Sequence, residues 1–143
     1  MIEGVRLFPL KRISVPKGDV LHALRSIDEG YCGFGEAYFT QIMHGETKGW
    51  KRHNRLTLNL VVVCGEVKFV IYDDRDGSPT RGKFEEVTLS PDYNYQRLTV
   101  APGLWMAFHG VGEDVSILMD IIPEPYVDTE SDRVDLSQIP FFF

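Results

Sequence analysis

The segment KGWKRHNR, from Lys48 to Arg55, gathers cationic side chains around one histidine. Side chains two apart on a β-strand share a face, so Lys51, His53 and Arg55 would project together. His53 titrates near neutral pH and is a candidate for proton transfer. Lys51 among other cations can lose its proton and act as a base, or stay charged and stabilise an enolate or a diphosphate. The segment therefore indicates either a proton-transfer site for an anionic ligand or a solvated charged face.

Aromatic residues elsewhere in the chain can complete such a site. Trp105 offers an indole on which a nucleobase can stack, although packing in a core is the more common role of this side chain. Tyr38 and Tyr126 would either line a cavity or cap its wall. Lys48 lies three residues before Lys51, so the strand must bend for the two to converge. We predict Lys51 and His53 as catalytic residues, with Lys48, Arg55, Tyr38 and Trp105 as substrate-binding residues.

The elements that must position these side chains read as short β-strands separated by turn residues. The clearest pair is the apolar run Leu58–Cys64 and the alternating run Glu66–Tyr72, joined at Gly65, where a tight turn needs a positive φ. Only Asp19–Ser26 offers a weak helical alternative. Further strands are expected at Glu36–Met43, Lys48–His53, Phe84–Leu89, Gln96–Val100 and Val115–Ile122. So many short strands must close into a barrel or a two-sheet jelly roll to hide their edges.

Composition narrows the class of protein. The 143 residues are expected to form one domain, residues 1–143, because two cores would not fit. With 15 basic and 21 acidic residues and a net charge of -6, the chain is unlike a general nucleic-acid binder. Cys32 and Cys64 are too few for a disulfide framework and are expected to be reduced. The first residues do not resemble a signal peptide and no run is long enough to span a membrane, so a cytoplasmic protein without membrane partners is expected.

Two glycine-containing segments, Gly45–Gly65 and Thr99–Phe108, resemble the two conserved motifs of the cupin superfamily. The resemblance implies an all-β fold of the cupin-type jelly-roll β-barrel class. In that pattern the metal-ligand positions fall on Lys51, His53, Leu58 and Met106. One imidazole, an ammonium, an aliphatic chain and a thioether do not suit zinc, iron or manganese. We therefore predict that the protein uses no metal and no other cofactor.

A narrower resemblance covers nearly the whole chain. The stretch VVVCGEVKFVIYDDRDGSPTRGKFEEVTLS, the APGLWMAF segment, which is interpreted as a turn, and the ending DRVDLSQIPFFF are similar to the dTDP-4-dehydrorhamnose 3,5-epimerases and their relatives, the dTDP-sugar 3,4-ketoisomerases. The resemblance implies proton abstraction beside the 4-keto group of a nucleotide-linked hexose, by a histidine base with a tyrosine acid on the opposite face. It places the family's arginine and histidine at Lys48 and Lys51 and the tyrosine at Met119. The carboxylate that pairs with the base in longer members has no evident counterpart.

Three functions are compatible with these features. The leading hypothesis is a metal-independent epimerase or isomerase of a nucleotide-linked 4-keto-6-deoxyhexose, working in the synthesis of a surface polysaccharide or a deoxysugar. The alternative is a non-catalytic cupin that binds a nucleotide sugar or another anion. A metal-dependent cupin is disfavoured by the ligand set. The resemblance also implies a homodimer, and an edge strand such as Val5–Ile13 has a physical reason to pair with a second copy. The apolar ending Phe141–Phe143 should pack on the barrel or on a partner chain.

Overall fold

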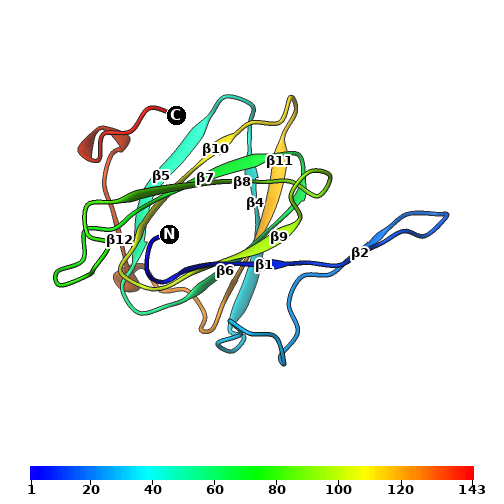
Figure 1. Cartoon of the computed structure of the whole chain (residues 1–143), viewed down its shortest axis with the longest axis horizontal. Coiled ribbons are helices and arrows are strands. Elements are labelled where there is room, and N and C mark those ends of the chain that lie inside the picture. The colour runs from blue at the N-terminus through cyan, green and yellow to red at the C-terminus, as the bar shows by residue number, and fades with distance from the viewer.

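Two antiparallel five-stranded sheets pack against each other in the computed structural model, which describes residues 1–143 (Figure 1). In spatial order the first sheet consists of β1 (Val5–Pro9), β9 (Gln96–Val100), β6 (Leu58–Cys64), β11 (Ser116–Ile122) and β4 (Glu36–Ile42). The second consists of β12 (Ser131–Arg133), β5 (Thr47–His53), β10 (Trp105–Gly110), β7 (Val67–Tyr72) and β8 (Phe84–Leu89). The remaining elements are β2 (Arg12–Ile13), β3 (Val20–Leu21) and the one-turn helices η1 (Asp128–Glu130) and η2 (Leu136–Gln138). The all-β jelly-roll prediction is confirmed.

The main core lies between the two sheets and follows from the alternation of the strands. Leu58, Leu60 and Val62 of β6 and Phe69 and Ile71 of β7 are all buried in one cluster. These residues recur every second position, so each strand presents one apolar face to the other sheet. Between β6 and β7, Gly65 has a φ of +78°, and a Cβ there would lie 2.2 Å from the Ser116 hydroxyl. The turn predicted at this glycine is therefore confirmed.

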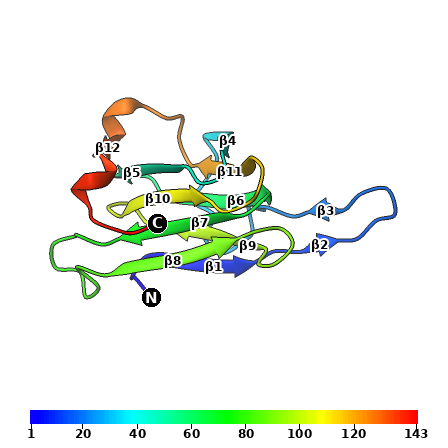
Figure 2. The ribbon, with the colours of Figure 1, turned by 90° about the horizontal axis from the view of Figure 1, so that it is seen from above.

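A second, smaller apolar cluster covers the outer face of the second sheet. Trp50, Val70 and Ala107 are fully buried there, beneath Ile139 of the C-terminal segment. Phe141 and Phe143 pack against the same cluster, whereas Phe142 is fully exposed. The C-terminal segment returns over this sheet in Figure 2. The central strands β10 and β7 of the sheet are consequently buried on both faces, and Trp50 anchors β5 in the same cluster.

The structure settles the weak helical alternative and differs from the sequence interpretation in one further segment. Asp19–Ser26 holds no helix; its first residues pair with β2 in the hairpin of β2 and β3, which extends away from the barrel (Figures 1 and 2). The segment after Pro102 was read as a turn, but Trp105–Gly110 forms strand β10. β10 is hydrogen-bonded to β5 on one side and β7 on the other. Met106 packs in the main core and Trp105 and Ala107 in the outer cluster, so both faces are buried and the strand lacks the alternation that marks a half-exposed strand.

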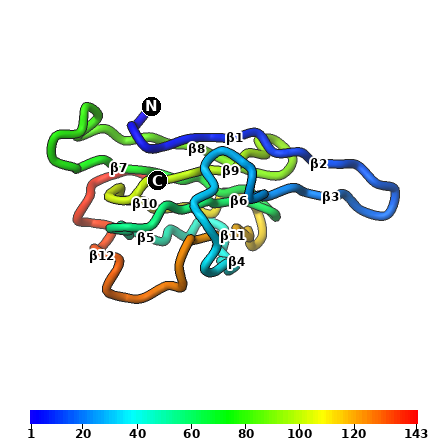
Figure 3. The backbone as a smooth tube through the Cα atoms, turned by 90° about the horizontal axis from the view of Figure 1, so that it is seen from below, coloured from blue at the N-terminus to red at the C-terminus, as the bar shows by residue number.

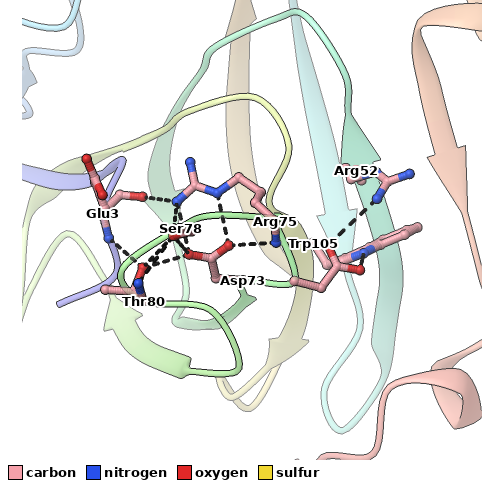
Figure 4. A network of polar contacts seen from close by, with 8 residues as sticks. Glu3, Arg52, Asp73, Arg75, Ser78, Thr80 and Trp105 are labelled. Carbon is pink, nitrogen blue, oxygen red and sulfur yellow. Dashed lines mark hydrogen bonds and ion pairs between the residues drawn. The ribbon is translucent and has the colours of Figure 1, made fainter.

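The loop between β7 and β8 contains a network of hydrogen bonds that connects the first residues of the chain to the barrel (Figure 4). Asp73 is fully buried and accepts hydrogen bonds from the side chains of Arg75, Ser78 and Thr80. Arg75 also donates to the backbone carbonyl of Glu3, and the hydroxyl of Thr80 accepts a hydrogen bond from the backbone N–H of Glu3. The bond from Arg75 is the main cause that holds the pKa of Asp73 well below its ordinary value. These donors explain why a carboxylate is tolerated here.

Candidate functional site

A cavity of about 300 Å³ lies between the two sheets. Both sheets contribute to its wall, because β4, β6 and β11 belong to one sheet and β5, β10 and β12 to the other. Half of the fourteen lining residues are hydrophobic, and the others are mainly charged or titratable. The lining residues are Tyr38, Thr40, Lys48, Gly49, Trp50, Lys51, His53, Leu58, Leu60, Met106, Phe108, Leu118, Asp120 and Arg133.

His53, at the end of β5, is paired with a carboxylate from η1. Its side chain is 5% exposed, and its Nδ1 lies 2.5 Å from Oε1 of Glu130. The other oxygen of Glu130 accepts the backbone N–H groups of Arg55 and Leu56. The pairing of β12 with β5 brings Glu130 to this point, since Ser131, the next residue, is opposite His53. Figure 3 shows the segment after β11 looping out and returning beside β5.

The environment of this pair fixes the protonation of the histidine. Burial opposes the charge of Glu130, but the N–H of Arg55, the ring of His53 and the N–H of Leu56 outweigh it and hold the pKa of Glu130 below its ordinary value. Burial also lowers the pKa of His53, although the bond to Glu130 acts in the opposite direction. A neutral imidazole beside an ionised carboxylate keeps its proton on Nδ1, as donor to Glu130. The unprotonated Nε2 is then available as a base.

Lys48 and Lys51 both reach the cavity because β5 carries an extra residue. Lys51 is opposite Met106 on β10, whereas Lys48 is opposite Phe108, so three steps on β5 match two on β10. Such a bulge turns residues three apart toward the same side. Gly49, within the bulge, has a φ of +145°, and a Cβ there would lie 2.6 Å from that of Ala107. The bend that the spacing of the two lysines required is present.

The two lysines have different partners. Lys48 donates through Nζ to the backbone carbonyl of Gln41 at 2.7 Å. The Nζ of Lys51 lies 4.3 Å from the centre of the Tyr126 ring, and Lys51 takes part in none of the ion pairs of the structure. The hydrogen bond with Ser131 is the main cause that lowers the pKa of the Tyr126 phenol. Lys51 is thus a cation at the cavity wall that a ligand can engage.

Tyr38 and Asp120 form a polar pair on the facing sheet. They are opposite each other on β4 and β11, and the Tyr38 hydroxyl donates to Oδ2 of Asp120 at 3.0 Å. Burial, followed by the nearby charge of Asp120, raises the pKa of Tyr38 and keeps the phenol protonated. Burial also raises the pKa of Asp120 to about 6. Sequence reasoning missed Asp120, although it shares a strand face with Leu118 in an otherwise apolar run.

Arg55 and Trp105 lie outside the cavity, contrary to the sequence prediction. β5 ends at His53, so the two-residue alternation does not extend to Arg55, which is exposed and ion-paired with Glu124. Trp105 faces the outer side of its sheet. Its Nε1 donates to Asp74 and the guanidinium of Arg52 stacks on its ring at 4.5 Å, in the arrangement seen in Figure 4. Tyr38, Lys48, Lys51 and His53 are the predicted site residues that the structure brings together.

Two residue correspondences drawn from the resemblance also need correction. Met119 alternates with the inward residues Leu118 and Asp120, so its side chain is on the outer side of β11 rather than in the cavity. No carboxylate was expected beside a base, but Glu130 is paired with His53. No local sequence signal marks Glu130, because its role depends on the long-range pairing of β12 with β5.

The cupin metal positions also meet in this cavity. Lys51, His53, Leu58 and Met106 all line it. Only His53 has a side chain that binds a hard or borderline divalent cation, and its Nδ1 is already bonded to Glu130. The structure holds no group of three or more His, Cys, Asp or Glu side chains arranged to hold a metal. The residues present therefore do not fit the metal that this fold often carries.

Architecture and cavity together define a cupin-type barrel with a titratable interior. A scan of the sequence against models of protein families finds no match. The chain is 35% identical to a dTDP sugar isomerase of Desulfovibrio desulfuricans G20, with a TM-score of 0.94, over 99% of this chain and 91% of that one. It is 26% identical over 137 residues to a probable low-salt glycan biosynthesis epimerase of Haloferax volcanii, covering 93% of this chain and 87% of the relative.

A structure of a 3'-monoepimerase from Streptomyces bikiniensis, in complex with dTDP-quinovose, has a TM-score of 0.83 at 22% identity. This match covers 94% of the chain and 71% of that protein. At that identity the likeness shows the fold. From the match to the Desulfovibrio protein, the chain belongs to the family of dTDP-sugar isomerases and related cupin epimerases. No helix of the structure is long and apolar enough to cross a membrane.

Proposed function

We propose that this chain is a metal-independent epimerase or isomerase acting on a nucleotide-linked 4-keto-6-deoxyhexose. The observation that carries the proposal is the pair formed by His53 and Glu130 at the wall of a cavity that also holds Lys51. An imidazole that is oriented by a carboxylate is suited to act as the base that removes a proton from carbon. The relatives that are named as sugar isomerases and epimerases agree with this chemistry.

The first chemical step follows from the protonation of the pair. Nε2 of His53 takes the proton from the carbon beside the keto group. The electron pair of that C–H bond forms a C=C bond, and the π pair of the carbonyl moves onto its oxygen to give an enolate. Glu130 stabilises the imidazolium that forms through the bond to Nδ1. The ammonium of Lys51, which has no carboxylate partner, stabilises the negative oxygen. In this proposal Lys51 supplies the positive charge for which other cupins use a metal.

Recognition of the nucleotide part would rest on cations at the edge of the same cavity. Lys48 and Arg133 line it from β5 and β12, and Arg133 is opposite Lys51 in the strand pairing. A diphosphate favours such cations through charge-assisted hydrogen bonds. The 3'-monoepimerase with a similar fold was crystallised with dTDP-quinovose, which is a ligand of this chemical class.

Hydrogen exchange tests the proposal directly. The protein is incubated in deuterated water with a dTDP-4-keto-6-deoxyhexose, and NMR follows deuterium at C3 and C5. We expect incorporation by the natural protein and its loss in His53→Asn, which keeps a polar side chain but removes the base. Binding of the nucleotide sugar without any exchange would instead identify a non-catalytic binding protein, and would overturn the enzymatic assignment.

We propose in addition that the protein is a cytoplasmic homodimer. β1 is hydrogen-bonded to β9 alone and so presents a free edge. The hairpin of β2 and β3 extends beyond the barrel and carries exposed apolar residues at Ile13, Val15 and Val20. A second copy that covers both features would remove this apolar surface and the free edge from water. Sedimentation that gives a monomer of 16.3 kDa at micromolar concentration would contradict the dimer.

A further inference from the structure

One carboxylate oxygen of Asp120 accepts a hydrogen bond and the other has no hydrogen-bond partner. Oδ2 accepts the hydrogen bond from Tyr38, whereas Oδ1 is buried without any hydrogen-bond partner. The residue is 7% exposed and lines the cavity. A buried polar atom without a partner is costly, and in native proteins it calls for a specific reason such as a catalytic role. The substrate that enters this cavity can supply the missing partner.

The surroundings of Asp120 favour its protonated form more strongly than water does. On β6 it is opposite Leu60, and Leu118 is next to it on the same face of β11. The titratable and charged groups that influence it are Tyr38 and Glu36 from β4 and Lys51 from β5. Desolvation is the largest influence and raises the pKa of Asp120 to about 6, although Tyr38 and Lys51 act in the opposite direction. A protonated Asp120 has an O–H to donate.

Asp120 and His53 reach the cavity from facing sheets. His53 is on β5 of one sheet, and Asp120 is on β11 of the other. A hexose ring held between the sheets therefore meets the imidazole on one face and the carboxyl group on the other. This placement allows a proton to leave from one side of a carbon atom and another proton to arrive from the opposite side.

We propose that Asp120 is a second catalytic residue, which delivers a proton from Oδ1 to the face of the enolate opposite His53, so that the carbon is inverted. The inference rests on the proposed function and deepens it. The enolate re-forms its carbonyl while the carbon takes the proton of Asp120, and the electron pair of the O–H bond remains on the carboxylate. His53 then holds the proton taken from the substrate. Exchange of protons with water restores both groups before the next turnover.

This assignment selects epimerisation over migration of the ketone. Moving a ketone to the neighbouring carbon delivers the proton to that neighbouring carbon, whereas epimerisation returns a proton to the same carbon from the opposite face. An acid on the opposite sheet serves inversion instead. The substrate class is therefore a 4-keto sugar with an invertible carbon beside the keto group, at C3 or C5.

The test compares exchange with inversion in one experiment. Natural protein, Asp120→Asn and the control Asp114→Asn are incubated with dTDP-4-keto-6-deoxyglucose in deuterated water. Asp114 is exposed at the turn before β11, so the same substitution there leaves the cavity unchanged. NMR measures deuterium in sugar of unchanged configuration and in inverted sugar. For Asp120→Asn we expect exchange to continue and inversion to fall by about 10²-fold or more, in keeping with loss of a general acid.

The possible results separate the two proposals. Exchange in the natural protein together with undiminished inversion in Asp120→Asn overturns the role of Asp120 alone. Migration of the ketone without inversion also overturns it. Absence of all exchange in the natural protein overturns the proposed function and this inference with it.

Tyr38→Phe gives a second readout that a structural role would not move. Removing the phenol removes a hydrogen bond that favours the ionised carboxylate, which raises the pKa of Asp120. Inversion requires the protonated acid, so its decline on the alkaline side should shift to higher pH in this variant. An unchanged pH profile in Tyr38→Phe would count against the proposal even if Asp120→Asn failed to fold.

Discussion

Nδ1 of His53 lies 2.5 Å from the carboxylate of Glu130, a residue that comes 77 positions later in the chain. The same carboxylate accepts the backbone N–H groups of Arg55 and Leu56, which are two and three positions beyond the end of β5. Glu130 is therefore fixed to the backbone independently of the imidazole. This arrangement sets the orientation of the ring and the nitrogen atom that carries its proton, which are the two requirements for a base at Nε2.

Replacing Glu130 by Gln should lower the rate of deuterium exchange by about 10²-fold. The amide group can present an N–H to Nδ1, which would move the ring proton to Nε2 and remove the base. Exchange followed by NMR measures the loss, and thermal unfolding separates it from a loss of folding. Glu124→Gln is the matched control, because Glu124 pairs with Arg55 at the surface. Equal exchange in both variants would contradict the role of Glu130.

Replacing Lys51 by Ala should strongly lower the rate of exchange while leaving the fold intact. The side chain contacts the Tyr126 ring and has no carboxylate partner, so its removal leaves no buried anion unpaired. Loss of one group that stabilises an oxyanion costs about 10² to 10³ in rate. Lys83→Ala, at an exposed position in the loop before β8, controls for the loss of a surface charge. Unchanged turnover and unchanged affinity for the nucleotide sugar in Lys51→Ala would remove Lys51 from the site.

Asp120 should make stability depend on pH in a predictable direction. Its pKa rises from an ordinary value of 3.8 to about 6 in the folded protein. The folded state therefore binds this proton more tightly, and the resulting stability is present below pH 4 and is lost as pH rises through 6. Asp120→Asn does not titrate, so its stability relative to the natural protein should rise by about 3 kcal/mol between pH 4 and pH 8. Denaturant unfolding at the two pH values measures the change; a difference that stays constant would show that Asp120 is already ionised at pH 4.

Trp105→Phe should affect stability rather than ligand binding. The indole N–H bonds to Asp74 on the outer side of the sheet, and the ring stacks against Arg52. Removing this donor removes one hydrogen bond, and because Asp74 is partly exposed and keeps its ion pair with Arg52, the loss costs about 0.5 to 1.5 kcal/mol. Calorimetry should show a lower unfolding temperature, with unchanged affinity for a dTDP-sugar. Weaker binding in the folded variant would return Trp105 to the binding site.

Local patterns were sufficient for most of the barrel. β6, β8 and β9 have the predicted bounds, because each alternates or is continuously apolar between clear turn residues. The converging lysines were also anticipated, since a spacing of three on a strand demands a bulge. β10 was missed because both of its faces are buried and a Pro-Gly pair precedes it.

The cavity was harder to predict than the barrel. Lys48, Lys51, His53 and Tyr38 were found from residue type and strand alternation. Asp120 was within reach of the same reasoning, because a lone acid in an apolar strand shares its face with Leu118. Glu130 was not, because a short strand far along the chain determines its position. Arg55 was misplaced because the strand ends two residues before it.

The order of β5 in its sheet has a consequence for how the protein is made. Both neighbours of β5, the strands β10 and β12, follow it in the sequence, so His53 is synthesised long before the residues that hold it. Pairings across long stretches of chain form slowly. A nascent chain on the ribosome would therefore carry its lysines and its histidine before it has a working base. Under the proposed function, the base at His53 would be complete only after Glu130 has been synthesised and β12 has paired with β5.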